Sequence, residues 1–73
     1  MSKTYKHVTL TGEGPSIERA IGEALRVSGE AVTGQSWLEV KDIRANLAPD
    51  ATVEAFQVTV MVAFGVDESK VGT

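Results

Sequence analysis

Hydrophobic and polar residues alternate in three stretches of the chain and recur with a helical period in a fourth. From Tyr5 to Thr11 the alternation places Val8 and Leu10 on one face, which is typical of a half-buried strand. The residues that follow, Gly12–Pro15, are of the kinds that turns favour. The pattern therefore predicts a first strand that ends at Thr11 and is followed by a turn.

A single amphipathic helix is predicted after this turn. Ser16 is a suitable N-cap residue, and Gly34 lies where a left-handed C-cap would end a helix of about four turns. Gly22 and Gly29 lie inside the helix, where they lower helix propensity but would allow close backbone packing. The residues that recur on its apolar side are Ile17, Ala20, Ile21, Ala24, Leu25, Ser28, Ala31 and Val32.

A second strand is predicted over residues 37–47, and its alternation changes phase in the middle. Leu38 and Val40 share one face, whereas Ile43 and the apolar residues after it fall on the alternate positions. A bulge or bend near Lys41–Asp42 would bring both sets to the same face, because one extra residue reverses the alternation.

The third strand is predicted from Val53 to Phe64, after a turn at Ala48–Ala51. The order strand, helix, strand, strand indicates an α+β fold, a three-stranded antiparallel sheet wrapped partly around one helix, in a single domain of residues 1–73. The helix can cover one face of the sheet. We expect that face to carry Val8, Leu10, Leu38, Val40, Phe56, Val58, Val60, Val62 and Phe64.

The opposite face of the predicted sheet is left open, and it suits a partner subunit or a ligand. Its residues are Trp37, Glu39, Gln57, Thr59, Met61 and Ala63, with one large aromatic ring and few charges. A chain of 73 residues buries little apolar surface by itself, and without cysteine it has no disulfides to compensate. Self-association is therefore expected.

Composition argues against several classes of function. The formal net charge is −3 and the basic residues are scattered, so we expect no nucleic-acid partner. The longest apolar run, residues 58–64, is too short to cross a bilayer, so we expect a cytoplasmic protein without a membrane partner. With no cysteine, a lone His7 and no phosphate-loop pattern, we expect neither catalytic residues nor a metal site.

Trp37 and Gln57 are the candidate binding residues on the open face. A tryptophan that only packs between subunits is the simpler interpretation of Trp37, because aromatic residues are enriched at interfaces. Gln57 has an amide that both donates and accepts, which matches a ring edge with alternating carbonyl oxygen and N–H groups. A stacking surface beside such an amide is a reasonable pocket for a flavin or a nucleobase.

The chain resembles the dodecin family over most of its length. The resemblance is carried by Tyr5–Lys6 with Val8 and Leu10, Ser16–Glu18, Trp37–Val40, Ile43–Arg44 and Phe56–Phe64. It implies a hollow homododecamer with cubic symmetry, in which flavins bind in antiparallel pairs across two-fold axes. Trp37 would then stack on the flavin ring, and Gln57 would hydrogen-bond its pyrimidine edge.

The resemblance also implies roles for two cations. Arg44 occupies a position near the flavin, where it would contact the ring, the ribityl chain or the phosphate, although a solvated strand charge explains it equally well. Lys6 matches a position near the phosphate of FMN, the expected cofactor, with FAD or riboflavin as alternatives. The basic residues with which some bacterial relatives bind coenzyme A are replaced around Glu30–Gly34 and after Phe64, which argues against that ligand.

Three functions stay open at this point. The leading hypothesis is non-enzymatic flavin binding, for storage and sequestration. The alternative is a structural homo-oligomer without a physiological flavin, in which Trp37 only packs at the interface. An enzyme that uses the flavin for redox chemistry ranks last, because rings stacked between tryptophans leave little room for a substrate.

Overall fold

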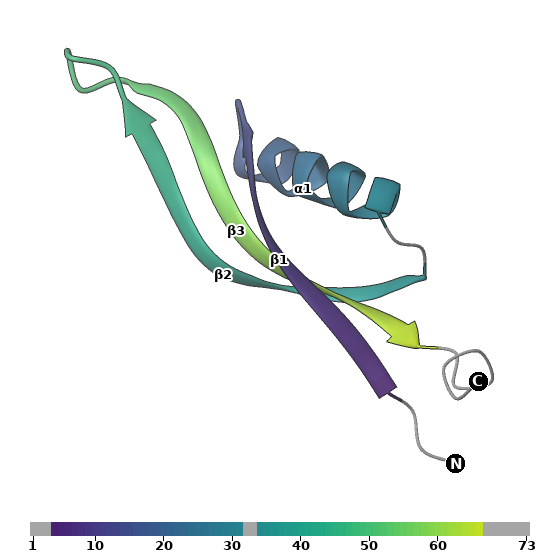
Figure 1. Cartoon of the computed structure of the whole chain (residues 1–73). Coiled ribbons are helices and arrows are strands. Elements are labelled where there is room, and N and C mark those ends of the chain that lie inside the picture. The colour runs from purple at the N-terminus through teal and green to yellow at the C-terminus, as the bar shows by residue number, and fades with distance from the viewer. Residues whose placement is uncertain (1–3, 32–33, 67–73) are drawn as a thin grey trace.

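The computed structural model describes residues 4–31 and 34–66 of the chain. Its elements are β1 (Thr4–Gly14), α1 (Ile17–Ala31), β2 (Gln35–Leu47) and β3 (Val53–Val66). The strands form one antiparallel sheet in the order β1-β3-β2, and α1 lies against one side of it (Figure 1). This confirms the predicted α+β fold and its β-α-β-β order.

Strand β1 is longer than the alternation predicts, because Gly12–Gly14 continue the strand instead of forming a turn. Gly12 pairs with Val58 and Gly14 with Phe56. A Cβ on Gly12 would overlap the carbonyl oxygen of Ala20, and one on Gly14 would lie 2.9 Å from the backbone nitrogen of Ala20. The two glycines are therefore explained by the close approach of α1 to β1, and the turn predicted there is wrong.

The start of α1 confirms the predicted cap. The backbone N–H of Arg19 donates a hydrogen bond of 3.1 Å to Oγ of Ser16, as expected for an N-cap serine. Gly34 has a φ of +84°, the left-handed conformation expected of it. Within the chain, the internal glycines make no close backbone contact: a Cβ on Gly22 would meet nothing, and one on Gly29 would reach only a glutamine side chain. Val32, predicted on the apolar side, lies outside the described residues.

The predicted irregularity in β2 is confirmed as a bulge at Lys41. Val40 pairs with Val60 and Asp42 pairs with Thr59, so Lys41 is the extra residue between two consecutive partners. Ile43 consequently pairs with Val58 and returns to the face that carries Val40.

The turn predicted at Ala48–Ala51 is also present. The backbone N–H of Ala51 donates to the carbonyl oxygen of Ala48 at 2.8 Å, and Ala51 has a φ of +69°. The carboxylate of Asp50 accepts hydrogen bonds from the hydroxyl (2.7 Å) and the backbone N–H (3.1 Å) of Thr52. These hydrogen bonds lower the pKa of Asp50.

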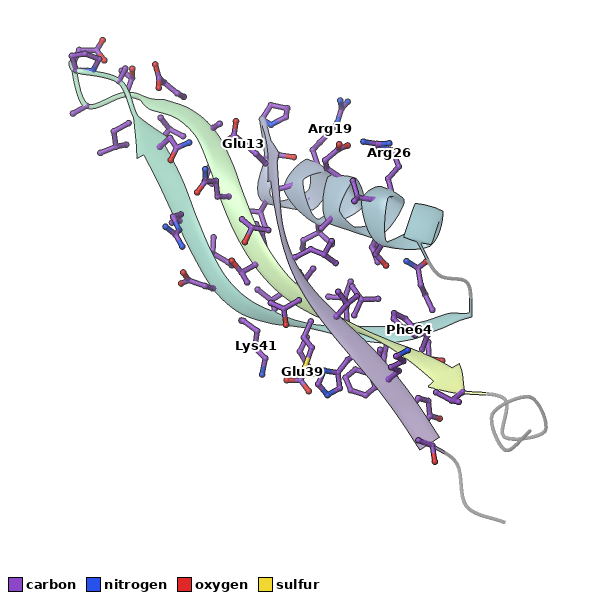
Figure 2. The ribbon with its side chains drawn as sticks, in the orientation of Figure 1. Glu13, Arg19, Arg26, Glu39, Lys41 and Phe64 are labelled. Carbon is purple, nitrogen blue, oxygen red and sulfur yellow. The ribbon has the colours of Figure 1, made fainter. Side chains whose placement is uncertain are left out.

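The register defines two faces, because residues directly opposite each other in a sheet project to the same side. The inner face, toward α1, carries Lys6, Val8, Leu10, Gly12 and Gly14 from β1, Phe56, Val58, Val60, Val62 and Phe64 from β3, and Gln35, Leu38, Val40, Ile43 and Ala45 from β2. The outer face carries Tyr5, His7, Thr9, Thr11 and Glu13, then Gln57, Thr59, Met61 and Ala63, then Trp37, Glu39, Asp42 and Arg44. Figure 2 shows Glu39 on the side of the sheet away from α1.

The core lies between α1 and the inner face of β1 and β3. Val58, Val60 and Val62 are fully buried there, against Ala20 and Ala24 of the helix. The prediction that α1 covers the whole inner face is confirmed for Leu38, which packs against the core, but is wrong for Val40 of β2 and Val8 of β1. On β2, Val40 is 44% exposed and Ile43 is 49% exposed. Val8 of β1 and Ile17, the first residue of α1, are also exposed. Strand β2 stays open because α1 packs on β1 and β3, while the β2–β3 hairpin extends beyond the helix (Figure 1).

The isolated chain is elongated for its length. Its radius of gyration is 15.5 Å, whereas a compact domain of this size has one of about 11 Å. Several large apolar side chains stay exposed, which is the surface expected of a chain that associates with copies of itself. In the described part of the chain, no helix is long and apolar enough to cross a membrane.

Candidate ligand-binding site

An aromatic pair occupies one end of the outer face. Trp37 of β2 lies opposite Ala63 of the central strand, and its side chain is 44% exposed, so it projects from the uncovered face as predicted. Its ring centroid lies 6.3 Å from that of Tyr5, with an angle of 55° between the ring planes. This tilted arrangement is one that aromatic pairs favour.

Tyr5 is a candidate site residue that the sequence pattern alone did not single out. It reaches Trp37 across β3 because the central strand carries only small residues there, Ala63 and Gly65. Ala63 is fully buried although no element covers this face, so larger side chains around it must shield it from solvent. The signal was present in the sequence: Tyr5 has the same odd parity as His7, which places it on the outer face.

A polar cluster occupies the other end of the outer face. Gln57 of the central strand lies between Glu13 of β1 and Arg44 of β2 in one row. Nε2 of Gln57 donates a hydrogen bond of 2.9 Å to Oε1 of Glu13, and the same oxygen accepts one of 3.3 Å from Nδ2 of Asn46. Arg44 is well exposed and lies 3.6 Å from the carboxylate of Asp42. We call Glu13, Gln57 and Arg44, which share one row of the sheet, the polar end, and Tyr5 with Trp37 the aromatic end.

The two ends lie on one face but not beside each other in one chain. Trp37 is in the row of Ala63, and Gln57 lies six residues earlier on the same strand. At the usual rise of a strand this is roughly 20 Å. The shared face of Trp37 and Gln57 is confirmed, and within one chain the two side chains are not adjacent.

Lys6 does not join the other predicted site residues. It pairs with Phe64 and therefore lies on the inner face, where its side chain is exposed. His7 lies on the outer face, in the row of Ala63 and Trp37.

A shallow hollow borders Trp37 at the free edge of β2. It has a volume of about 310 Å³ and is lined by Leu25, Gln35, Ser36, Trp37, Leu38 and Val62. Nε2 of Gln35 donates hydrogen bonds to Oγ of Ser28 (2.5 Å) and to the carbonyl oxygen of Leu25 (3.2 Å), which fastens the start of β2 to α1. Residues 4–31 and 34–66 contain no cluster of acidic, histidine or cysteine side chains that could hold a metal ion.

Comparison with known proteins identifies the family to which this chain belongs. The model of the dodecin family matches residues 4–67. The chain belongs to the dodecin family. A dodecin from Thermus thermophilus is 36% identical over 70 residues, which cover 94% of this chain and all of that protein.

Solved structures of dodecins have the same architecture. The tt0972 protein from Thermus thermophilus superposes with a TM-score of 0.82 at 33% identity, covering 90% of this chain and 97% of that one. The dodecin from Streptomyces davaonensis superposes with a TM-score of 0.82 at 26% identity, covering 92% and 98% of the two chains. Membership of this family implies that the chain works in a multimeric assembly, in line with its exposed apolar residues.

Proposed function

We propose that this dodecin is a non-enzymatic flavin-binding protein of the cytoplasm that stores or sequesters FMN, FAD or riboflavin in a homododecamer. The observation that carries the proposal is the division of the outer face into an aromatic end and a polar end. An aromatic pair offers a stacking surface, and an amide beside an arginine offers partners for a ring edge or a phosphate.

The separation of the two ends favours a site shared between chains. A three-ring heterocycle cannot reach from Trp37 to Gln57 of the same chain across roughly 20 Å. A two-fold axis through the middle of the outer face would bring two chains together in opposite directions, so that the aromatic end of each meets the polar end of the other. Such contacts come in pairs, which agrees with the paired flavins that the family resemblance implies.

Among the predicted contacts, the register favours Trp37, Gln57 and Arg44 over Lys6. Arg44 lies beside Gln57 and, being exposed, is free to exchange its contact with Asp42 for a phosphate or a ring oxygen. Lys6 starts from the opposite face, so its part in phosphate binding needs a different chain of the assembly. Coenzyme A is not part of the proposal.

Flavin fluorescence tests this function directly, because a stacked indole quenches an excited flavin. FMN added to the purified apoprotein should lose its fluorescence in proportion to the protein until the sites are filled. Trp37→Ala should weaken binding at least about 30-fold, the effect of losing an aromatic anchor at a binding site. Glu18→Ala, which changes an exposed helix residue, is the control and should bind as the unchanged protein does.

A structural homo-oligomer without a flavin ligand is the second candidate. It is favoured by the exposed apolar residues of β2 and of the hairpin, which need a partner whether or not a ligand is present. A large colourless assembly that leaves FMN fluorescence unchanged at saturating protein would support it and would contradict the flavin proposal.

A further inference from the structure

Glu13 belongs to the polar end and was not among the predicted site residues. Its carboxylate is the shared acceptor of the hydrogen bonds there. Its Oε1 accepts from Nε2 of Gln57 at 2.9 Å and from Nδ2 of Asn46 at 3.3 Å. It thus connects side chains from all three strands across the outer face.

The backbone holds Glu13 in a fixed place. Its two neighbours, Gly12 and Gly14, are the positions where β1 touches the backbone of α1 too closely for any side chain. The strand cannot slide or tilt there without either opening the contact or overlapping Ala20. The carboxylate is therefore presented from a rigid segment, although the side chain itself is exposed.

This placement decides which way the Gln57 amide points. A carboxylate only accepts hydrogen bonds, so the NH₂ group of the amide must face Glu13 and Oε1 must face away from it. The amide is left with its carbonyl oxygen and one N–H for another partner. Arg44, on the other side of Gln57 in the row, is a pure donor and favours the same orientation.

We propose that Glu13 is a positioning residue that fixes the orientation of the Gln57 amide and thereby makes the site select planar ring edges that carry an N–H group next to a carbonyl. The inference rests on the proposed flavin function and deepens it. An edge of that kind donates to Oε1 and accepts from the remaining N–H. A ring alkylated at this nitrogen leaves Oε1 without a donor, and a buried acceptor without a partner is costly.

The test compares riboflavin with N3-methylriboflavin, whose edge lacks the N–H group. Both ligands are uncharged, so removing the Glu13 charge does not alter a phosphate contact. The unchanged protein should quench riboflavin with an affinity roughly 10- to 100-fold higher than that for N3-methylriboflavin. In Glu13→Ala this ratio should fall to about 3-fold or less, because the freed amide can turn its NH₂ group to the carbonyl oxygens.

Two further variants separate positioning from a general structural role. Asn46→Ala removes the other hydrogen bond to the same oxygen but leaves that of Gln57, so its ratio should equal that of the unchanged protein. In Glu13→Gln the new amide oxygen can still accept a hydrogen bond from Gln57, so this variant should keep part of the affinity ratio. It also provides a second test if Glu13→Ala does not fold.

The outcomes distinguish this inference from the function it rests on. Equal loss of affinity for both ligands in Glu13→Ala, with an unchanged ratio, would overturn the role of Glu13 and leave flavin binding intact. The role of Glu13 would also be overturned if the affinity ratio of the two ligands fell as far in Asn46→Ala as in Glu13→Ala. If the unchanged protein quenches neither ligand, the flavin function fails, and the role of Glu13 fails with it.

Discussion

The central strand β3 and the edge strand β2 carry apolar residues in the same rows of the inner face, but only those of β3 are covered by the chain itself. Val58 and Val60 are fully buried under α1, whereas their β2 partners Ile43 and Val40 are nearly half exposed. The residues are of the same kind and lie in the same rows of one sheet. The difference arises because one helix spans two strands of the three.

This contrast separates what folds the chain from what assembles it. The contact of α1 with β1 and β3 needs no partner, since all of its residues belong to one chain. The apolar surface of β2 can be buried only by another molecule. Substitutions in the two regions should therefore differ in kind, the first affecting folding and the second affecting association.

The largest effect is expected from Gly12→Val, under the helix. The new side chain would overlap the backbone of Ala20, and backbone cannot move aside as a side chain can. We expect a loss of about 3 kcal/mol or more in the free energy of unfolding, measured by urea denaturation at constant protein concentration. Gly22→Ala, where a Cβ meets nothing in the chain, should instead gain up to about 1 kcal/mol. Equal midpoints for the two variants would contradict the close contact.

Ile43→Asp tests the uncovered strand. Its side chain contributes little to the core of its own chain, but a charge in an apolar contact between chains is costly. We expect the mass measured by light scattering to fall to that of a few chains, with loss of flavin quenching as well. Arg19→Asp, on the side of α1 that faces away from the sheet (Figure 2), should keep the full mass. An unchanged assembly for Ile43→Asp would show that β2 is not where the chains meet.

Tyr5→Leu tests the link between the covered strand β1 and the uncovered strand β2. The change keeps an apolar side chain but removes the ring that packs against Trp37. Such a pair contributes about 0.5 to 1.5 kcal/mol beyond the buried area. Because the pair is already formed without a ligand, its loss acts on binding only through the position of Trp37, and flavin affinity should fall by no more than about 13-fold. Fluorescence titration measures the loss, which should be much smaller than that of Trp37→Ala.

The smallest effect is expected at the hairpin tip, where Asp50 holds the connection between β2 and β3. The hydrogen bonds from Thr52 lower the pKa of Asp50 in the folded chain, so the carboxylate stabilises the fold above its unfolded pKa. This stability is lost as the pH falls through the lowered pKa. Asp50→Ala should therefore unfold at slightly lower urea than the unchanged protein at pH 7, and the difference should vanish in acid. A difference independent of pH would contradict this.

Local patterns were enough to predict the elements and the two faces. The phase change in residues 37–47 predicted the bulge at Lys41, because a single extra residue reverses the alternation at every position after it. Ser16 was identified as the cap because capping depends on neighbours three residues apart. Trp37 and Gln57 were assigned to the outer face by parity alone.

Features that depend on distant parts of the chain could not be predicted in this way. Gly12 and Gly14 resemble a turn in sequence, and only the position of α1 shows that they allow contact with it. Val40 was expected under the helix because the pattern does not reveal which two strands the helix covers. The hydrogen bond between Glu13 and Gln57 joins residues 44 positions apart, and no spacing rule connects them.

The bulge also constrains the length of β2. Trp37 and Arg44 are seven positions apart, an odd number that would put them on opposite sides of a regular strand, yet the structure has both on the outer face. The extra residue at Lys41 makes the difference. Deleting Lys41 would therefore turn either the tryptophan or the arginine away from the proposed flavin, although no residue that contacts the ligand would be changed. Natural dodecins that share both side chains should thus tolerate substitution at this position far better than its loss.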